Sequence, residues 1–143
     1  MKVAIVGSRG SCEEDYLYLE NEIPRNASEI ISGGAKGVDL LARRFAESHG
    51  LMLTEILPDY GGSGGKSAPL IRNREIVDRA DMVFAFWDGR SKGTAYTISY
   101  CLTAGKPLRV VMLGEEKPKS ESGFKSKSRL CEVVYIGRKG RLG

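Results

Sequence analysis

The sequence predicts an α/β protein with a Rossmann-like, mostly parallel sheet that carries helices on both faces. Three observations support this prediction. Short apolar runs alternate with segments of helical periodicity over residues 1–113. Most of the runs are apolar at successive positions, as in strands that are buried on both faces. Glycine-rich turns follow several runs and open the next helical segment, which is the order of a doubly wound sheet.

The expected strands are short apolar runs bounded by glycine or polar residues. Five of them lie in the first part of the chain, at Val3–Val6, Glu29–Ser32, Met52–Leu57, Met82–Phe86 and Arg109–Leu113. A sixth short strand is expected at Glu132–Ile136. The stretch 114–128 between the last two is polar and charged, which is typical of a loop.

Helical patterns fill the gaps between the expected strands. The strongest is one apolar stripe at positions i, i+3, i+4, i+7 and i+8, formed by Val38, Leu41, Ala42, Phe45 and Ala46. A second stripe lies within Ala95–Leu102. Weaker helical patterns occupy Glu13–Glu22 and Ala68–Arg79, and Pro69 suits a first helical turn.

The charge of the chain is uneven along its length. Residues 1–114 hold 14 Lys+Arg and 14 Asp+Glu, so they are neutral, whereas residues 115–143 hold 8 and 4, an excess of 8 − 4 = +4. We therefore divide the chain into a Rossmannoid domain at 1–114 and a basic extension at 115–143, whose short strand joins the same domain. Such an extension can contact nucleic acid, or it can be a solvated tail.

Composition narrows the classes of function. No apolar run approaches the roughly 20 residues that span a bilayer, so no membrane contact is expected. The three cysteines are widely spaced and form no metal-binding pair. The single histidine, His49, precedes Gly50 at an expected helix end and offers no catalytic triad. We expect a cytoplasmic homo-oligomer without a metal or a cofactor.

Gly65-Lys66-Ser67 in a glycine-rich stretch raises the question of a nucleoside-triphosphate P-loop. That pattern needs a glycine five positions before Gly65, where Tyr60 stands, and the nearby glycine is Gly61. No later strand ends in an acidic pair for magnesium. The segment Pro58–Ala68 is instead predicted to be a flap at a strand's carboxyl end, from which Lys66 contacts a ligand.

Three other loops follow predicted strands and precede helices, at 7–10, 32–37 and 88–94. In a parallel sheet all three lie at the carboxyl edge, where open α/β proteins bind ligands. Helix N-termini there offer unpaired N–H groups and partial positive charge. Tight turns alone also explain single glycines, but three such loops together favour a phosphate site. The expected contacts are Gly7, Ser8, Arg9, Ser32, Gly33, Gly34, Ala35, Gly89, Ser91, Gly93 and Thr94.

Three of these glycines are expected to have a specific role in the backbone. We expect Gly33, Gly34 and Gly93 to allow close approach of the ligand and left-handed backbone angles. Asp39, near a helix start, is either a capping residue or a contact to ribose. Arg72 and Asn73 lie early in the helix behind the flap, and the guanidinium suits phosphate.

The motifs Gly7-Ser8-Arg9, then 32–42 (SGGAKGVDLLA), then 65–73 (GKSAPLIRN), then Gly93-Thr94 occur in a fixed order. This order resembles the SLOG superfamily over residues 1–113, and within it the YspA-like proteins of unknown function. The superfamily also contains the Lonely Guy phosphoribohydrolases and the DNA-processing protein DprA. The resemblance implies a Rossmann-like fold, in agreement with the residue patterns.

The resemblance also implies site residues. Lonely Guy enzymes hydrolyse nucleoside 5′-monophosphates and use an arginine and a glutamate. Arg72 resembles the arginine in place, whereas Thr97 stands at the position of the glutamate. Glu75 or Asp88 is the available substitute carboxylate, and we take Arg72 and Glu75 as the candidate catalytic pair.

Taken together, the sequence predicts binding of a nucleotide or nucleotide-derived phosphate ligand at the carboxyl edge of the sheet, in a sensing or processing role. Two alternatives stay open. One is an N-glycosidic hydrolase of nucleoside monophosphates, and the other is DprA-like binding of single-stranded nucleic acid. Whether the protein is an enzyme is left open by the sequence.

Overall fold

A computed structural model describes residues 1–8, 12–34, 37–62, 65–113 and 131–135. Within them the chain forms a six-stranded sheet whose paired neighbours are all parallel, in the order β3-β2-β1-β4-β5-β6. The α/β, Rossmann-like prediction is confirmed. The strands are β1 (Lys2–Gly7), β2 (Glu29–Ser32), β3 (Met52–Glu55), β4 (Met82–Trp87), β5 (Leu108–Met112) and β6 (Cys131–Tyr135).

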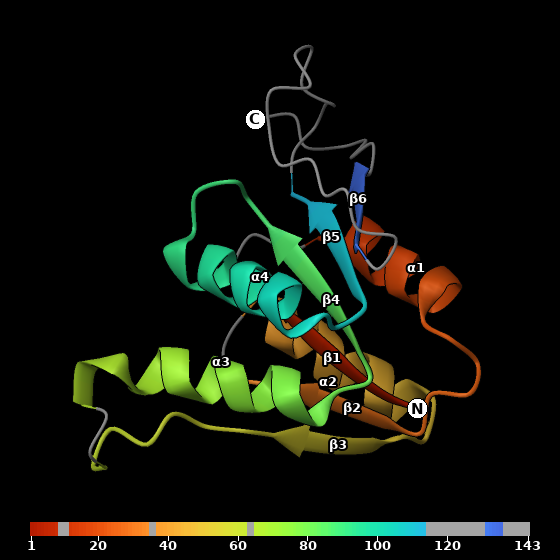
Figure 1. The fold of residues 1–143 in the computed structure, drawn as a ribbon. Helices are drawn as coiled ribbons and strands as arrows, with labels where there is room; N and C mark the ends of the chain where they lie inside the picture. The colour runs from red at the N-terminus through yellow and green to blue at the C-terminus, as the bar shows by residue number, and fades with distance from the viewer. Residues whose placement is uncertain (9–11, 35–36, 63–64, 114–130, 136–143) are drawn as a thin grey trace.

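Helices cover both faces of this sheet. Figure 1 shows α3 and α4 in front of it, and α1 and α2 on the other side. The bounds are α1 (Glu13–Glu22), α2 (Val38–Ser48), the short 3-10 helix η1 (Gly65–Ser67), α3 (Ala68–Arg79) and α4 (Lys92–Ala104). No helix among the described residues is both long and apolar enough to cross a membrane.

The core has two halves, one on each face of the sheet. Successive side chains of a strand point to opposite faces, and β1 shows this directly. Val3 and Ile5 pack in the half that α1 and α2 cover. Ala4 and Val6 pack in the half that α3 and α4 cover. All four side chains are at most 7% exposed, which explains why the strand reads as a continuous apolar run.

The strand ends differ slightly from the sequence-based bounds. The third strand was expected to reach Leu57 and ends at Glu55. The N–H of Ile56 still donates to the carbonyl oxygen of Ser32 at 2.9 Å. Pro58, two residues on, has no N–H to donate, so the chain leaves the sheet there. The last strand pairs with β5 in the register Leu108↔Cys131.

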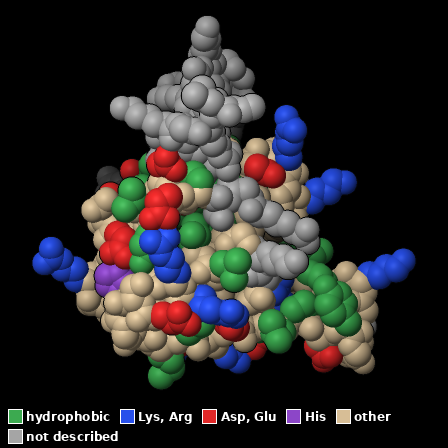
Figure 2. All heavy atoms as spheres, turned by 180° about the vertical axis from the view of Figure 1, so that it is seen from behind, with side chains coloured by type: hydrophobic (Ala, Val, Ile, Leu, Met, Phe, Trp, Pro, Cys, Tyr) green, Lys and Arg blue, Asp and Glu red, His purple; other side chains and the backbone are tan. Residues whose placement is uncertain are grey.

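Charged side chains are interspersed on the face that α1 and α2 form, as Figure 2 shows. Ion pairs join Arg43 to Glu55 at 2.9 Å and Arg44 to Glu13 at 2.8 Å. His49, at the end of α2, lies 2.9 Å from Glu20 on α1. The mixture of signs agrees with the neutral charge count of residues 1–114.

The strand order places a crevice between β1 and β4. From β1 the chain builds outward to β2 and β3 on one side, and from β4 to β5 and β6 on the other. Connections that leave in opposite directions open a gap at the carboxyl ends of the two central strands. The N–H of Ser8 donates to the carbonyl oxygen of Phe86 at 2.8 Å, so Ser8 is fixed at the floor of this gap.

Candidate functional site

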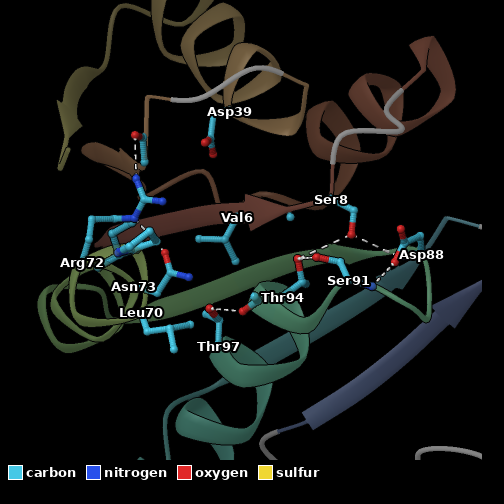
Figure 3. Close-up of a pocket in the computed structure, with 15 residues that line it drawn as sticks. Val6, Ser8, Asp39, Leu70, Arg72, Asn73, Asp88, Ser91, Thr94 and Thr97 are labelled. Atoms are coloured by element: carbon cyan, nitrogen blue, oxygen red, sulfur yellow. Dashed lines mark hydrogen bonds between the residues drawn. The ribbon is translucent and has the colours of Figure 1, made fainter. Parts of the chain in front are cut away.

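A cavity of about 420 Å³ lies at this crevice, between the starts of α2, α3 and α4. Its volume falls within the range of small-molecule sites. Figure 3 shows hydroxyl groups and Asp88 at one end, and Arg72, Asn73 and Leu70 at the other. The lining residues are Val6, Gly7, Ser8, Gly33, Asp39, Pro69, Leu70, Arg72, Asn73, Ile76, Asp88, Ser91, Gly93, Thr94 and Thr97.

Three hydroxyl groups cluster where β1 meets the start of α4. The Oγ1 of Thr94 lies 3.5 Å from Ser8 Oγ and 3.3 Å from Ser91 Oγ. Both distances are long for hydrogen bonds between hydroxyl groups, which centre near 2.7–2.8 Å. Ser8 and Thr94 are each 6% exposed. Ser8 Oγ also accepts from the N–H of Asp88, at a similarly long 3.4 Å. Because these contacts are all long, the hydroxyls hold hydrogen-bonding capacity that a ligand oxygen can use.

Asp88 orders the turn before α4. Its Oδ1 accepts hydrogen bonds from the N–H groups of Arg90 at 2.8 Å and Ser91 at 2.7 Å. Trp87 closes the same turn by donating from Nε1 to the carbonyl oxygen of Ser91 at 3.0 Å. The amide of Ser91 is the main cause that lowers the pKa of Asp88, against desolvation by partial burial. Asp88 is consequently a carboxylate at neutral pH.

The glycine at position 93 lies inside α4 and not in a left-handed loop. The helix begins at Lys92, and Gly93 is absent from the glycines with positive φ. An added Cβ meets no heavy atom of the described residues within 4 Å. The expectation of a left-handed backbone at Gly93 is therefore wrong, because Gly93 is part of the first turn of α4. Nearby Thr97 is 1% exposed and donates to the carbonyl oxygen of Gly93 at 3.0 Å.

The loop after β2 forms a second wall. Gly34 has φ +69°, as predicted, but Gly33 does not have a positive φ. Gly33 serves close packing instead, because a Cβ there lies 2.6 Å from Arg72 Nη1 and 3.2 Å from Asp39 Oδ2. Asp39 is 9% exposed, in the first turn of α2. Its carboxylate thus lies beside the backbone of Gly33, on the cavity.

Arg72 ties together three segments that are distant in sequence. Its Nη1 donates to the carbonyl oxygens of Gly33 at 2.9 Å and Ile56 at 3.2 Å. Its Nε donates to Asn73 Oδ1 at 2.8 Å. Three of the five N–H groups that a guanidinium carries are therefore bound to the protein. This arginine holds the ends of β2 and β3 against α3.

Several predicted contacts lie off the cavity. Ser32 and Gly34 do not line it, and the N–H of Gly34 lies 3.4 Å from Ser32 Oγ. Gly89 is an exposed turn residue with φ +79°. Lys66 is exposed in η1 and does not line the cavity. Arg9 and Ala35 lie outside the described residues, as does most of the basic extension.

Glu75, the predicted partner of Arg72 in catalysis, is not brought to the main cavity. It forms an ion pair with Arg79 one helical turn later, at 2.7 Å. It lines a smaller cavity of about 160 Å³ on the other side of Arg72, together with Leu57 and Ile71. The helix period explains this placement, because residue 75 lies on the side of α3 that carries Ile71 and not Asn73. Asp88 is the carboxylate that lines the cavity at the end of β4.

Sequence reasoning missed the apolar part of the lining. Val6 comes from β1, and Leu70 and Ile76 flank Asn73 by three positions in α3. The i±3 spacing places all three helix residues on one face. This spacing was present in the sequence, but it does not say that the face meets a cavity. No group of three or more metal-ligating side chains occurs within the described part of the chain.

The sequence resembles that of one known phage protein. No family model matches the chain. The gene 61 protein of Mycobacterium phage D29 is 31% identical over 116 residues, which cover 75% of this chain and 93% of that protein.

Two solved structures are similar in fold. One is DNA processing protein A from Helicobacter pylori, described for its single-stranded DNA binding mode, with 24% identity, a TM-score of 0.61, and coverage of 85% of this chain and 67% of that one. The other is TM1055, a structural-genomics target, with 21% identity, a TM-score of 0.62, and coverage of 94% and 91%. At these identities the likeness shows the Rossmann-like α/β fold alone, and membership of the SLOG superfamily stays a prediction. The narrower YspA-like assignment stays a prediction.

Proposed function

Because the chain belongs to the family of the gene 61 protein of Mycobacterium phage D29, a name that states no activity, we propose its function from the cavity itself. The protein binds a nucleotide or a nucleotide-derived ligand, with the phosphate at the start of α4 and the remainder toward α3. The observation that carries the proposal is the placement of the cavity at the β1/β4 crossover, where doubly wound sheets bind ligands.

The start of α4 has the chemistry of a phosphate site. The first N–H groups of a helix lack partners within the helix and carry partial positive charge. Gly93 has no side chain to block the approach of an anion. The hydroxyls of Ser8, Ser91 and Thr94 surround this point with weakly engaged donors. Thr94 contributes both its hydroxyl and its position in the first turn.

The rest of the cavity suits a nucleoside. Asp39 offers a carboxylate that can accept hydrogen bonds from ribose hydroxyl groups, and its position beside Gly33 leaves it on the cavity. The walls from Val6, Leu70 and Ile76 are apolar. A volume of about 420 Å³ accommodates a mononucleotide better than a long polymer.

Ligand-induced thermal stabilisation tests the proposal. The panel contains the four nucleoside 5′-monophosphates, ribose 5-phosphate, NAD, ADP-ribose and a single-stranded oligodeoxynucleotide. A ligand at 100 times its Kd stabilises the folded state by about 2.7 kcal/mol, which raises Tm by several degrees for a chain of this size. Stabilisation by mononucleotides supports the proposal, whereas stabilisation by the oligonucleotide alone favours nucleic-acid binding.

A matched pair of variants assigns the binding to this cavity. Gly93→Val fills the approach to the first turn of α4, and Ser99→Ala changes an exposed position later in the same helix. The first variant is expected to lose the ligand-induced shift, and the second is expected to keep it. Equal shifts in both variants contradict the site.

Hydrolysis of a nucleoside monophosphate is the second candidate function, and Asp88 is the observation that favours it. An ionised carboxylate on the cavity can stabilise the cationic sugar of an N-glycosidic transition state. Positioned acid–base groups contribute about 10²–10⁴-fold. Thr97 supplies only a hydroxyl that is bonded to Gly93, so turnover is expected to be slow. Free base released by wild type but not by Asp88→Asn identifies an enzyme, and no release from either leaves a binding protein.

A further inference from the structure

The amide of Asn73 has a fixed orientation. Its Oδ1 lies 2.8 Å from Nε of Arg72. A guanidinium has donors and no acceptor, so the group facing it is the amide oxygen and the NH₂ group points elsewhere. Nδ2 has no hydrogen-bond partner among the described residues, and Asn73 lines the cavity. Figure 3 shows Asn73 beside Arg72, with its amide toward the cavity.

The arginine that orients this amide is itself held in place. Its Nη1 is bound to the carbonyl oxygens of Gly33 and Ile56, which follow β2 and β3. Gly33 leaves the room for this contact, because a Cβ there lies only 2.6 Å from Nη1. The donor that Asn73 presents is therefore pre-organised, and little side-chain freedom is lost when a ligand accepts from it.

The surroundings of Asn73 identify the part of the ligand that reaches it. Leu70 and Ile76 lie three residues before and after it on α3, and Val6 faces them from β1. The hydroxyl groups that suit a phosphate are at the opposite end of the cavity. A planar heterocyclic base has apolar faces for such walls and acceptor atoms along its edge.

We propose that Asn73 is a specificity-determining residue that donates a hydrogen bond to an acceptor atom on the edge of a nucleotide base, with Arg72 as the positioning residue. This inference rests on the proposed nucleotide-binding function and adds the group that reads the base. It assigns Arg72 a role through Asn73 and the backbone, in contrast to the catalytic role that the sequence resemblance implies.

The test compares a ligand with a base and one without. The probes are AMP, GMP, CMP and UMP against ribose 5-phosphate, with Kd measured by calorimetry. Asn73→Asp keeps an oxygen for Arg72 and replaces the NH₂ donor by an acceptor. Asn73→Leu removes the donor without adding charge. Asn21→Asp, on the exposed surface of α1, is the control for the added charge.

The expected result is selective. Both Asn73 variants weaken the tightest-binding monophosphate about tenfold or more, the factor of one hydrogen bond of about 1.4 kcal/mol, and leave ribose 5-phosphate within about twofold. Arg72→Lys also reduces the preference for the base-bearing ligand, because lysine lacks the planar fork that holds the amide. The Asn21→Asp control leaves both affinities unchanged.

Two results overturn the inference. If the Asn73 variants weaken both kinds of ligand by one factor, the residue contacts the sugar phosphate or supports the fold. If they weaken neither kind of ligand, the Asn73 amide does not bind the base. In both cases wild type still binds the probes and the proposed function stands. If wild type binds none of the five probes and neither NAD nor ADP-ribose, the proposed function fails and the inference fails with it.

Discussion

The two ends of the cavity are built differently. At the α4 end, the hydroxyl groups of Ser8 and Ser91 lie 3.5 and 3.3 Å from the hydroxyl group of Thr94. At the α3 end, the hydrogen bonds of Arg72 to Asn73 and Gly33 measure 2.8 and 2.9 Å. The first end holds hydroxyl groups that are poorly satisfied within the protein, whereas at the second end Arg72 is bound to three protein groups and the NH₂ group of Asn73 is left for a ligand.

This difference separates stability from binding. Short hydrogen bonds at the α3 end join three segments of the chain, so their loss costs folding free energy. Long contacts at the α4 end contribute little to folding, and their value appears when a ligand oxygen completes them. Mutation of Arg72 is therefore expected to lower mainly stability, and mutation of Thr94 is expected to lower mainly the affinity for a phosphate.

The largest effect on stability is expected at Gly7, which lines the cavity. Gly7 ends β1, and a Cβ added there lies 2.4 Å from the carbonyl oxygen of Phe86 and 2.9 Å from its Cβ. Neither atom can move without separating β1 from β4. Gly7→Ala is therefore expected to cost about 3 kcal/mol of unfolding free energy, measured by urea denaturation.

Gly93→Ala is the control for that experiment. Among the residues that the structure describes, the added Cβ meets no heavy atom within 4 Å, and alanine is favoured over glycine inside a helix by about 1 kcal/mol. This variant is expected to be as stable as wild type or more so. Equal destabilisation by both substitutions contradicts the close contact between β1 and β4 as the cause.

The next largest effect on stability is expected at the α3 end of the cavity. Arg72→Met keeps much of the side-chain length and removes all three donors, leaving the carbonyl oxygens of Gly33 and Ile56 without them. An unsatisfied buried polar group costs about 1–3 kcal/mol, and we expect a loss of about 2 kcal/mol in unfolding free energy. Arg74→Met, at an exposed position in the same helix, is expected to change stability by less than about 0.5 kcal/mol. A comparable loss in both variants argues against the scaffold role.

Much of this arrangement is predictable from sequence. Continuous apolar runs and the stripe of Val38–Ala46 define the strands and α2, and both follow from local periodicity. Gly34 has the left-handed backbone that a Gly-Gly pair after a strand suggests. The carboxyl edge as the place of the cavity follows from the parallel order of the strands.

What the sequence does not show depends on distances across the fold. The carbonyl oxygen of Ile56 is a partner of Arg72 only because β3 ends at Glu55 and the chain turns over α3. The choice between Glu75 and Asp88 as the cavity carboxylate depends on the rotation of α3 about its axis. Gly93 was expected in a loop because a glycine early in a helix looks the same in sequence as one just before it.

The third prediction concerns binding at the α4 end. Thr94→Val removes the hydroxyl that lies between Ser8 and Ser91, with little change in shape. We expect less than about 1 kcal/mol of lost stability, since the hydroxyl contacts are long, and about a tenfold weaker Kd for ribose 5-phosphate. Thr97→Val is the matched variant, because its hydroxyl already donates to Gly93 at 3.0 Å, and its Kd is expected to stay within about twofold. A larger loss of affinity in Thr97→Val places the phosphate deeper along the helix.

The smallest effect is expected from the titration of Asp88, which orders the α4 end before any ligand arrives. Hydrogen bonds from the N–H groups of Ser91 and Arg90 lower its pKa in the folded state. A lowered folded pKa means that the stabilisation is complete above the unfolded value of about 3.9 and is lost as pH falls through the folded pKa.

Asp88→Asn keeps an oxygen for both amides and does not titrate. The difference in Tm between wild type and this variant, measured without ligand, is therefore expected to be constant from pH 7 to 5 and to narrow below about pH 4. Because Asp88 is exposed to solvent, screening keeps this difference small. A constant difference down to pH 3 shows that the backbone hydrogen bonds do not depend on the charge, and the α4 end then resembles the α3 end in being held by geometry alone.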